Sequence, residues 1–185
     1  MKRLTKCLCY SIGMSLMSYG SMVLATPQAV ILIPHAEKQS NGPDLTKQGR
    51  RTARFYAHAI TRDAAITPNA IIANSTVDQR ALGSIQTCQP LARKLKLKVD
   101  SEYQESDYQT MVHKVLSAQS YNGKVVAICW DVHNFPQILK DFGVTQPVAA
   151  LHPKQIYQLR FAAPGTGAAA VSADVVTLKR ETGSR

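Results

Sequence analysis

The apolar residues of this chain follow two different periods, and each period predicts a different kind of element. Three short segments are apolar at every position, which is typical of strands buried on both faces of a parallel sheet. Elsewhere apolar residues recur at three- and four-residue spacings, which predicts amphipathic helices. The expected strands are 29–33, 70–73 and 125–130, and the expected helices cover about 46–62, from near Asp78 to about 95, 108–116, and 136 to about 142.

The end of the chain has a different pattern. Residues 157–161 and 168–178 favour two strands, and a Pro-Gly-Thr-Gly turn lies between them. Strands that alternate with helices predict a parallel sheet, because each crossover helix returns the chain to the same end of the sheet. We therefore expect an α/β fold, a three-layer α/β/α sandwich whose mostly parallel central sheet has an antiparallel edge strand.

The first 25 residues predict a secretory signal peptide. Lys2, Arg3 and Lys6 precede an apolar run without acids over 7–24, and small residues lead to Ala25. A transmembrane anchor is the alternative, but serines and glycines interrupt the run and weaken it as a permanent span. We expect a leader over 1–25, a single domain over 26–185, export to a periplasm or out of the cell, and no stable membrane anchor after processing.

Composition favours a globular domain with a basic surface. The chain is 45% hydrophobic and 18% charged, and its formal net charge of +10 falls by three when the leader is removed. The cations are spread along the sequence, without the long basic block that is typical of nucleic-acid binding. Their densest group, at 93–98, coincides with an expected helix end, where cations suit the helix dipole. The positive charge is compatible with an anionic ligand but decides little by itself, and no nucleic-acid partner is expected.

Two cysteines, Cys88 and Cys129, remain in the expected mature chain. They lack the close spacing of a zinc site, and we expect neither a metal site nor a cofactor. An exported chain can oxidise such a pair to a disulfide. Cys129 lies in an apolar strand, however, so two buried free thiols are at least as good an interpretation.

Polar side chains follow each of the three buried strands. The carboxyl ends of parallel strands meet at one edge of a sheet, where ligands bind in open α/β folds. A neutral imidazole is a competent nucleophile and a guanidinium can hold phosphate oxygens, so such an edge could support phosphoryl transfer. The alternative is that His35 is an ordinary histidine of a surface loop. The polar residues are His35 after the first strand, Asn74, Ser75 and Arg80 after the second, and Asp131 and His133 after the third.

Five segments carry a resemblance to a known family, in the family's order. They are ILIPHAEK, DLTKQGRRTARF, NSTVDQRALGSIQT, VVAICWDVHNFPQILKDFG and LHPKQIYQLRF, and they extend over nearly all of the expected mature chain. Together they resemble the histidine phosphatases of the phosphoglycerate mutase-like superfamily, and the last segment suits the exported members. The resemblance implies a phosphoglycerate mutase-like fold and, in an active enzyme, hydrolysis of phosphoric monoesters through a phosphohistidine intermediate.

The resemblance also implies roles for individual residues. His35 matches the histidine that becomes phosphorylated, and Arg80 matches one of the family's two phosphate-binding arginines. Asn74 and Ser75, at the exit of the second strand, are further phosphate-binding candidates. His133 is the candidate for the second catalytic histidine, although it stands one residue beyond the matching position.

Two positions depart from the family's pattern. Pro34 stands where the family has an arginine before the nucleophile, and Val132 stands where it has the second histidine, if Trp130 and Pro136 fix the register. Proline supplies neither a charge nor a backbone donor. Losing one preorganised donor typically costs roughly a hundred- to a thousand-fold in rate, so we expect a degenerate site.

The general acid is harder to assign. Glu37 could serve, as could one of the acids Glu102, Glu105 and Asp107. No pattern in the sequence places any of them in the pocket, and solvated surface acids are the simpler interpretation.

Three functional hypotheses follow. The favoured one is an exported pseudoenzyme of the histidine-phosphatase type that binds a phosphate-like anion or a phosphorylated small molecule at His35 and Arg80, with weak or lost hydrolysis. The second is an active periplasmic phosphatase that works through a phosphohistidine at His35. The third is a non-catalytic module that binds a protein partner. The departures at Pro34 and Val132 support the first hypothesis, and the intact His35 and Arg80 support the second.

Overall fold

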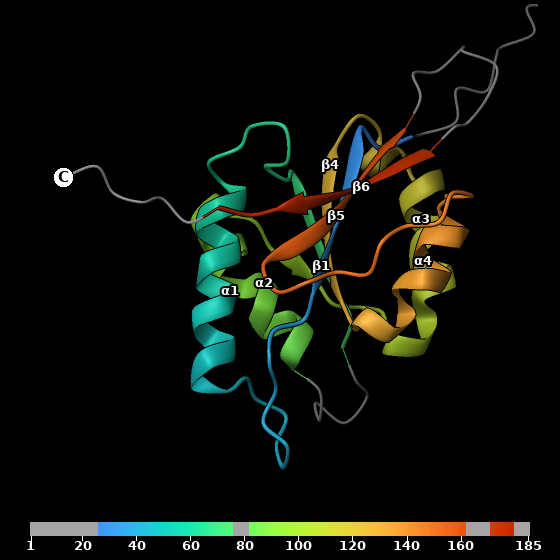
Figure 1. Cartoon of the computed structure of the whole chain (residues 1–185). Helices are drawn as coiled ribbons and strands as arrows, with labels where there is room; N and C mark the ends of the chain where they lie inside the picture. The colour runs from blue at the N-terminus through green and yellow to red at the C-terminus, as the bar shows by residue number, and fades with distance from the viewer. Residues whose placement is uncertain (1–25, 76–81, 162–170, 180–185) are drawn as a thin grey trace, which may run out of the picture.

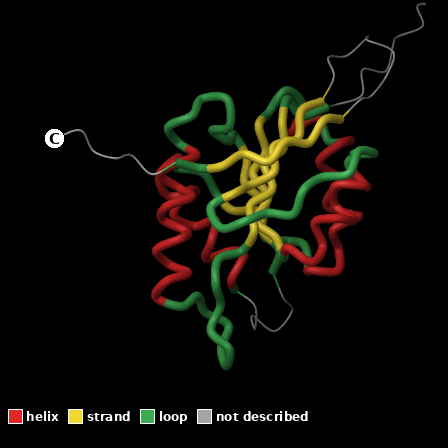
Figure 2. The backbone as a smooth tube through the Cα atoms, viewed as in Figure 1, coloured by secondary structure: helices red, strands yellow, loops and turns green. Residues whose placement is uncertain are grey.

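The computed structural model describes residues 26–75, 82–161 and 171–179 of the chain. These residues form a six-stranded sheet with helices on both faces (Figure 1, Figure 2). The strands are β1 (Ala29–Pro34), β2 (Ala70–Ala73), β3 (Val99–Asp100), β4 (Val125–Trp130), β5 (Gln155–Phe161) and β6 (Val171–Thr177). Their order across the sheet is β3, β2, β4, β1, β5, β6.

Helices connect the strands and form the two outer layers. The α-helices of the described ranges are α1 (Lys47–Ile60), α2 (Gly83–Leu95), α3 (Tyr108–Ser117) and α4 (Phe135–Asp141). Short 3-10 helices, η1 (Glu105–Asp107), η2 (Gln119–Tyr121) and η3 (Val132–Asn134), precede or follow them. Figure 1 shows α1 and α2 on one side of the sheet and α3 and α4 on the other.

The sheet is mostly parallel. The neighbours β3, β2, β4 and β1 all pair in parallel, whereas β5 pairs antiparallel with β1, and β6 pairs antiparallel with β5. This confirms the expected three-layer α/β/α sandwich with an antiparallel edge. The antiparallel part contains both C-terminal strands.

The central strands are buried on both faces, as their continuous apolar runs predict. Successive side chains of a strand point to opposite faces of the sheet. In β1, Val30 and Leu32 join the core beneath α3 and α4, while Ile31 and Ile33 join the core beneath α1 and α2. None of the four is more than 1% exposed. All six residues of β4 are likewise buried, so the two strands that carry the site residues form the rigid centre of the molecule.

The helix α1 forms where the sequence predicts it. Thr46 caps the helix by accepting the Gly49 backbone N–H through its hydroxyl oxygen, at 2.9 Å. The predicted apolar stripe faces the core, because its members Leu45, Gly49, Ala53, Tyr56 and Ile60 are all buried.

The helix α2 differs from its prediction in its buried face. The expected start near Asp78 lies outside the described residues, and within them the helix begins at Gly83. The sequence predicts a buried stripe of Leu82, Ile85, Leu91 and Leu95 from their helical spacing. Leu91 is buried as predicted, whereas the other three are only half-buried. The helix packs against α1 as well as against the sheet, so small residues are needed where the elements approach closely. The residues that it buries are Gly83, Ser84, Thr87, Cys88, Leu91 and Ala92.

The structure adds a strand that the sequence pattern does not predict. β3 has two residues, and it pairs in parallel with β2 through Val99 and Ile71. Two residues are too few to show a periodic pattern in the sequence. The strand can be identified only from its pairing with β2 in the structure. At the other edge, β5 begins two residues before the predicted strand, and residues 168–170 of the last predicted strand lie outside the described residues.

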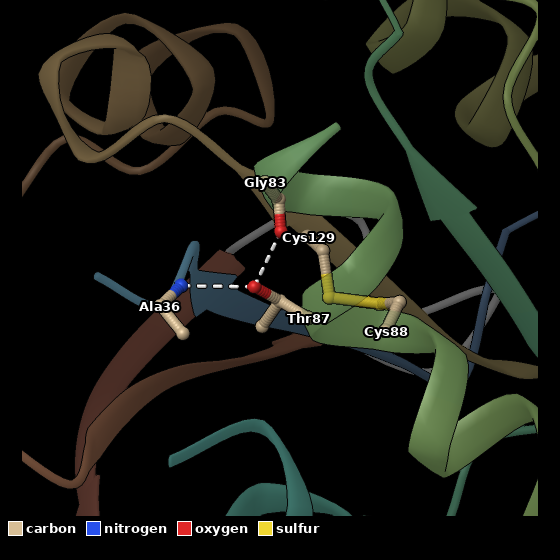
Figure 3. The surroundings of a disulfide bond; sticks show 5 residues. All are labelled: Ala36, Gly83, Thr87, Cys88 and Cys129. Carbon is tan, nitrogen blue, oxygen red and sulfur yellow. Dashed lines mark hydrogen bonds between the residues drawn. A yellow bond between two sulfur atoms is a disulfide. The ribbon is translucent and has the colours of Figure 1, made fainter. Parts of the chain in front are cut away.

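Cys88 of α2 and Cys129 of β4 form a disulfide, with their Cα atoms 6.0 Å apart (Figure 3). The structure therefore favours the bonded pair over two free thiols. The bond joins residues 41 positions apart, and closing a loop of that length in the unfolded chain corresponds to about 4 kcal/mol of stabilisation. It fastens α2 to the centre of the sheet.

None of the helices in the described part of the chain is long and apolar enough to cross a membrane. The predicted signal peptide, residues 1–25, lies outside that part. Its cleavage, and the export that it implies, therefore stay predictions.

Candidate functional site

The exits of β1 and β4 lie side by side at the carboxyl edge of the parallel strands. Pro34, the last residue of β1, is opposite Trp130, the last residue of β4. The next residue, His35, donates its backbone N–H to the Trp130 carbonyl at 3.0 Å. The strand pairing thus extends to His35 and brings it close to Asp131, which follows Trp130.

One carboxylate holds both candidate histidines. Asp131 Oδ2 lies 3.0 Å from His35 Nε2, and Asp131 Oδ1 lies 2.7 Å from His133 Nδ1. Oδ1 also accepts the His133 backbone N–H at 3.0 Å, which fixes the start of η3. Both histidines were expected at this edge. Asp131 was expected at this edge as well, but the sequence did not indicate that it would bind both histidines.

The hydrogen bonds of His35 constrain its protonation. Its Nδ1 lies 3.0 Å from the Ala36 carbonyl oxygen and its Nε2 lies 3.0 Å from Asp131 Oδ2, so both ring nitrogens face acceptors. A doubly protonated ring donates to both, and Asp131 balances its charge. In a neutral ring, either Nε2–H donates to Asp131, or the proton is on Nδ1 and the lone pair on Nε2 faces a carboxylate. In each of these states Asp131 competes with a phosphate for Nε2.

Asp131 is a largely buried carboxylate. Its side chain is 13% exposed, and that of His35 is 18% exposed. Burial raises the pKa of Asp131, but the hydrogen bonds from His133, together with the charge and hydrogen bond of His35, outweigh burial. The pKa of this carboxyl therefore lies below its ordinary value, and the group is ionised at neutral pH.

The helix α2 supports the segment that carries His35. Thr87 accepts the Ala36 backbone N–H at 2.9 Å and donates its own hydroxyl proton to the Gly83 carbonyl at 2.6 Å (Figure 3). Thr87 is only 1% exposed, so no solvent could replace its bond to Ala36. The disulfide of the adjacent Cys88 holds this turn of α2 against β4. Sequence reasoning gave Thr87 no role, although it closes the NSTVDQRALGSIQT motif.

The first turn of α1 packs against the backbone of Glu37. Thr46 donates its N–H to the Glu37 carbonyl at 3.0 Å, and a Cβ at Gly49 would lie 2.2 Å from the same carbonyl oxygen. Only glycine permits so close an approach. This explains the glycine of the DLTKQGRRTARF segment. The Glu37 side chain is exposed, and in the described residues it makes no hydrogen bond to His35.

Val132 and His133 lie at the rim of the site. Val132 is 43% exposed, and the side chain of His133 is 89% exposed. The turn of η3 brings His133 back onto Asp131, and its link to His35 runs through that shared carboxylate. The one-residue shift from the family's position therefore leaves His133 as a partner of Asp131. Pro34 ends β1 with no N–H to donate.

The exit of β2 is joined to other segments. Asn74 donates its N–H to the Cys129 carbonyl at 3.4 Å, while Ser75 donates its N–H to the Tyr103 carbonyl at 2.7 Å. Asn74 is 2% exposed, and its side-chain Oδ1 has no hydrogen-bond partner among the residues that the structure describes. Neither residue bonds to His35 within the described ranges. Arg80 lies outside those ranges, so its phosphate contact stays a prediction.

Among the remaining acids, Glu105 has a side chain bonded to η3. Its Oε1 accepts the Asn134 side-chain amide at 3.4 Å. Asp107 takes part in the capping box of η1, and Glu102 is exposed. None of these three bonds to either histidine of the site as far as the structure describes the chain.

The site offers two imidazoles on one carboxylate. Within the described ranges, no group of three or more His, Cys, Asp or Glu side chains is placed to hold a metal ion. The arrangement can attract an anion when His35 is protonated. Asp131 competes with that anion for His35 Nε2.

Two solved structures are similar to this chain. Open reading frame Rv3214 from Mycobacterium tuberculosis matches with a TM-score of 0.54 and 13% sequence identity, over 82% of this chain and 97% of that chain. The putative phosphohistidine phosphatase SixA from Agrobacterium tumefaciens matches with a TM-score of 0.44 and 16% identity, over 73% of this chain and 92% of that chain. No family model and no curated protein sequence matches the chain.

The first of these similarities establishes a shared fold and nothing more specific, and the second has too low a TM-score to add to it. The mostly parallel, six-stranded sheet with its antiparallel edge is consistent with a phosphoglycerate mutase-like fold, as the sequence motifs implied.

Proposed function

We propose that this chain is an exported protein of the histidine-phosphatase type that binds a phosphate-like anion at His35 and Arg80 and hydrolyses phosphomonoesters weakly or not at all. The observation that carries the proposal is the 3.0 Å contact between His35 Nε2 and Asp131 Oδ2. A histidine that attacks phosphorus needs a lone pair on a nitrogen that phosphorus can approach. Here a carboxylate occupies that approach, and its charge repels phosphate.

The cations at the sheet edge support binding without turnover. A protonated His35 attracts an anion, and Arg80 would add a guanidinium that can hold two phosphate oxygens. Pro34 and Val132 replace the arginine and the histidine that the family uses to stabilise the transition state. The site therefore retains groups for affinity and lacks groups for rate.

The disulfide between Cys88 and Cys129 supports the exported part of the proposal. Disulfides persist in oxidising compartments and are rare in the cytosol of mesophiles. The predicted signal peptide would deliver the chain to such a compartment. The ligand would then be a phosphorylated small molecule or a phosphate-like anion outside the cytoplasm.

An active phosphatase is the second candidate, and the other ring nitrogen of His35 favours it. The Ala36 carbonyl oxygen lies 3.0 Å from His35 Nδ1, and as an acceptor it favours a proton on that nitrogen. In the neutral ring this leaves the lone pair on Nε2, which is the form that attacks phosphorus. In this function the Asp131 side chain would move away from Nε2 when substrate binds.

Two measurements on the mature chain separate the candidates. Calorimetry with inorganic phosphate should show binding that weakens at least about tenfold in Arg80→Ala, since a hydrogen bond to a charged group contributes roughly 1.5–3 kcal/mol. Turnover of p-nitrophenyl phosphate should be absent or only slightly above that of His35→Ala. A high turnover that is lost in His35→Ala would establish the active phosphatase instead. A parent protein that neither binds phosphate nor hydrolyses the ester would reject both candidates.

A further inference from the structure

A second basic feature of the molecule lies between α1 and α2. The two helices lie next to each other on one face of the sheet (Figure 1), and their outer surfaces enclose a hollow of about 730 Å³, here called the α1–α2 groove. Its walls are formed by Asp44, Arg50, Ala53, Arg54, Ala57 and His58 on one side and by Gln86, Gln89, Pro90, Arg93 and Lys94 on the other.

Helical periodicity accounts for the positive charge of this groove. In α1, Arg50, Arg54 and His58 recur every four residues, so their side chains share one side of the helix. Arg93 and Lys94 stand in the last turn of α2 and face them from the opposite wall. Cations therefore flank the groove on both sides.

A second hollow, of about 510 Å³, extends the basic surface along α1. It shares Arg54 and His58 with the α1–α2 groove. Its other lining residues are Arg51, Phe55, Ala59, Arg62 and Lys179. The positive surface is thus longer than the groove itself.

Very little negative charge within the described residues compensates these cations. Asp44 is the acid among the groove's lining residues, and its carboxylate already accepts the Gln86 amide at 2.5 Å. Arg54 and Arg93 are exposed and form no ion pair with the residues that the structure describes. Lys94 Nζ lies 3.2 Å from His58 Nδ1, so the lysine donates to another basic group. A ligand with negative charge would supply the missing counter-charge.

We propose that the α1–α2 groove binds an extended, acidic segment of a partner protein. Guanidinium groups hold carboxylates through paired hydrogen bonds, and Arg54 and Arg93 offer such groups from opposite walls. Between the cations, the half-buried Pro90 adds some apolar surface for an aliphatic side chain of a peptide, while Ala53 and Ala57, 1% and 3% exposed, form the floor of the groove. A flat membrane surface could not enter a groove between two helices, so a chain segment fits this shape better.

The groove and the site around His35 can be tested separately. The lining residues of the groove include neither His35 nor Asp131, nor any residue that bonds to the Asp131 carboxylate. α2 serves both regions with different faces, because Thr87 and Cys88 point to the sheet while Gln89 and Arg93 line the groove. A failed phosphate experiment would therefore leave the groove proposal untouched.

The test uses the mature protein and a fluorescein-labelled peptide of mixed glutamate and leucine residues. Fluorescence anisotropy should show binding that weakens as salt increases, because exposed charges are screened. The double variant Arg54→Glu with Arg93→Glu should bind at least about tenfold more weakly, since it replaces two attractions by two repulsions. The matched control is Lys114→Glu with Lys140→Glu, which changes net charge equally at exposed positions of α3 and α4. That control should lose less than about twofold.

Three outcomes of this experiment would contradict the proposal. Equal loss in both double variants would mean that net charge, not the groove, attracts the peptide. Absence of peptide binding by the parent at low salt would reject it as well, as would stronger Arg54-dependent binding of inorganic polyphosphate or of vesicles with anionic lipid. If the charge reversal alters the circular dichroism spectrum, the milder pair Arg54→Gln with Arg93→Gln replaces it, with Lys114→Gln and Lys140→Gln as its control.

Discussion

The site around His35 and the α1–α2 groove handle positive charge in opposite ways. At the site, His35 and His133 share the carboxylate of Asp131, so a positive charge on either imidazole would have an internal counter-charge. In the groove, Arg54 and Arg93 have no carboxylate partner among the described residues. An anion at the site must displace Asp131, whereas an anion in the groove displaces only water. Basic residues alone therefore do not predict how strongly a region binds anions.

Burial explains the difference between the two regions. The side chains of His35 and Asp131 are less than one fifth exposed, and charges removed from water require partners. Arg54 and Arg93 stand on helix surfaces, where water solvates an unpaired guanidinium at little cost. Charged groups at the sheet edge are therefore paired within the protein. The exposed arginines of the two helices remain able to bind an external anion.

The largest expected effect comes from adding unpaired cationic groups to the site. The double variant Pro34→Arg with Val132→His would restore the two groups that the family's pattern has at these positions. Hydrolysis of p-nitrophenyl phosphate should rise at least about a hundredfold, because each preorganised donor contributes roughly 3 kcal/mol to transition-state stabilisation. The two gains need not add, since both groups would contact one phosphoryl unit.

The control for this gain is the triple variant that also carries His35→Ala, which should return to background. A folded double variant, with an unchanged circular dichroism spectrum, that is no faster than the parent would show that Pro34 and Val132 do not occupy the family's positions.

Reduction of the disulfide should affect the site around His35 more than the α1–α2 groove. The free energy of unfolding in urea should fall by about 4 kcal/mol in dithiothreitol, because the Cys88–Cys129 bond closes a long loop. The variant Cys88→Ala with Cys129→Ala should be insensitive to the reductant. Phosphate binding should weaken in the reduced protein more than peptide binding does, since the bond braces the strand that leads to Asp131. The reverse order would contradict the role assigned to this brace.

Neutralising Asp131 should make the site behave more like the groove. In Asp131→Asn the amide retains the shape of the side chain but removes the charge that competes with phosphate. Two charges about 4 Å apart interact by roughly 1–4 kcal/mol across the range from bulk water to a protein surface, so phosphate affinity should rise about tenfold or more. Isothermal calorimetry measures the change. Peptide binding in the groove is the control and should not change. An unaltered phosphate affinity would mean that Asp131 does not compete with phosphate for His35 Nε2.

A smaller effect is expected from the support beneath His35. Thr87→Val keeps the size of the side chain but leaves the Ala36 N–H without its acceptor. A buried, unpaired donor costs roughly 1–3 kcal/mol, which urea denaturation would show as a lower free energy of unfolding. Thr87→Ser retains the hydroxyl and should lose less. Equal losses in both variants would assign the effect to the missing methyl group instead.

The smallest effect concerns acid. The pKa of Asp131 is lower in the folded protein than the ordinary value of about 3.9, so its ionisation stabilises the fold above that pH. This contribution is lost as the pH falls from about 4 through the folded-state pKa. The stability difference between the parent and Asp131→Asn should therefore shrink as the pH falls below about 4. If the stability difference between the parent and Asp131→Asn stayed constant down to the pH of acid unfolding, the ionisation of Asp131 would not contribute to stability.

The sequence by itself determined the described strands other than β3, most of the helices and the three-layer arrangement. Runs such as 125–130 are apolar at every position, and this pattern is compatible only with burial on both faces. The cap at Thr46 and the stripe through Tyr56 similarly fixed α1. These features are encoded within a few neighbouring residues, so a pattern along the chain can reveal them. His35 at the exit of the first strand was predictable for the same reason.

Only the tertiary structure decided which polar groups touch. Cys88 pairs with Cys129, Thr87 accepts from Ala36, and Asp131 takes both His35 and His133, although most of these partners are far apart in the sequence. Their meeting depends on strand order, on the register between β1 and β4, and on the rotation of α2 about its axis. Such contacts depend on how distant segments pack together. The local spacing of residue types therefore cannot predict them.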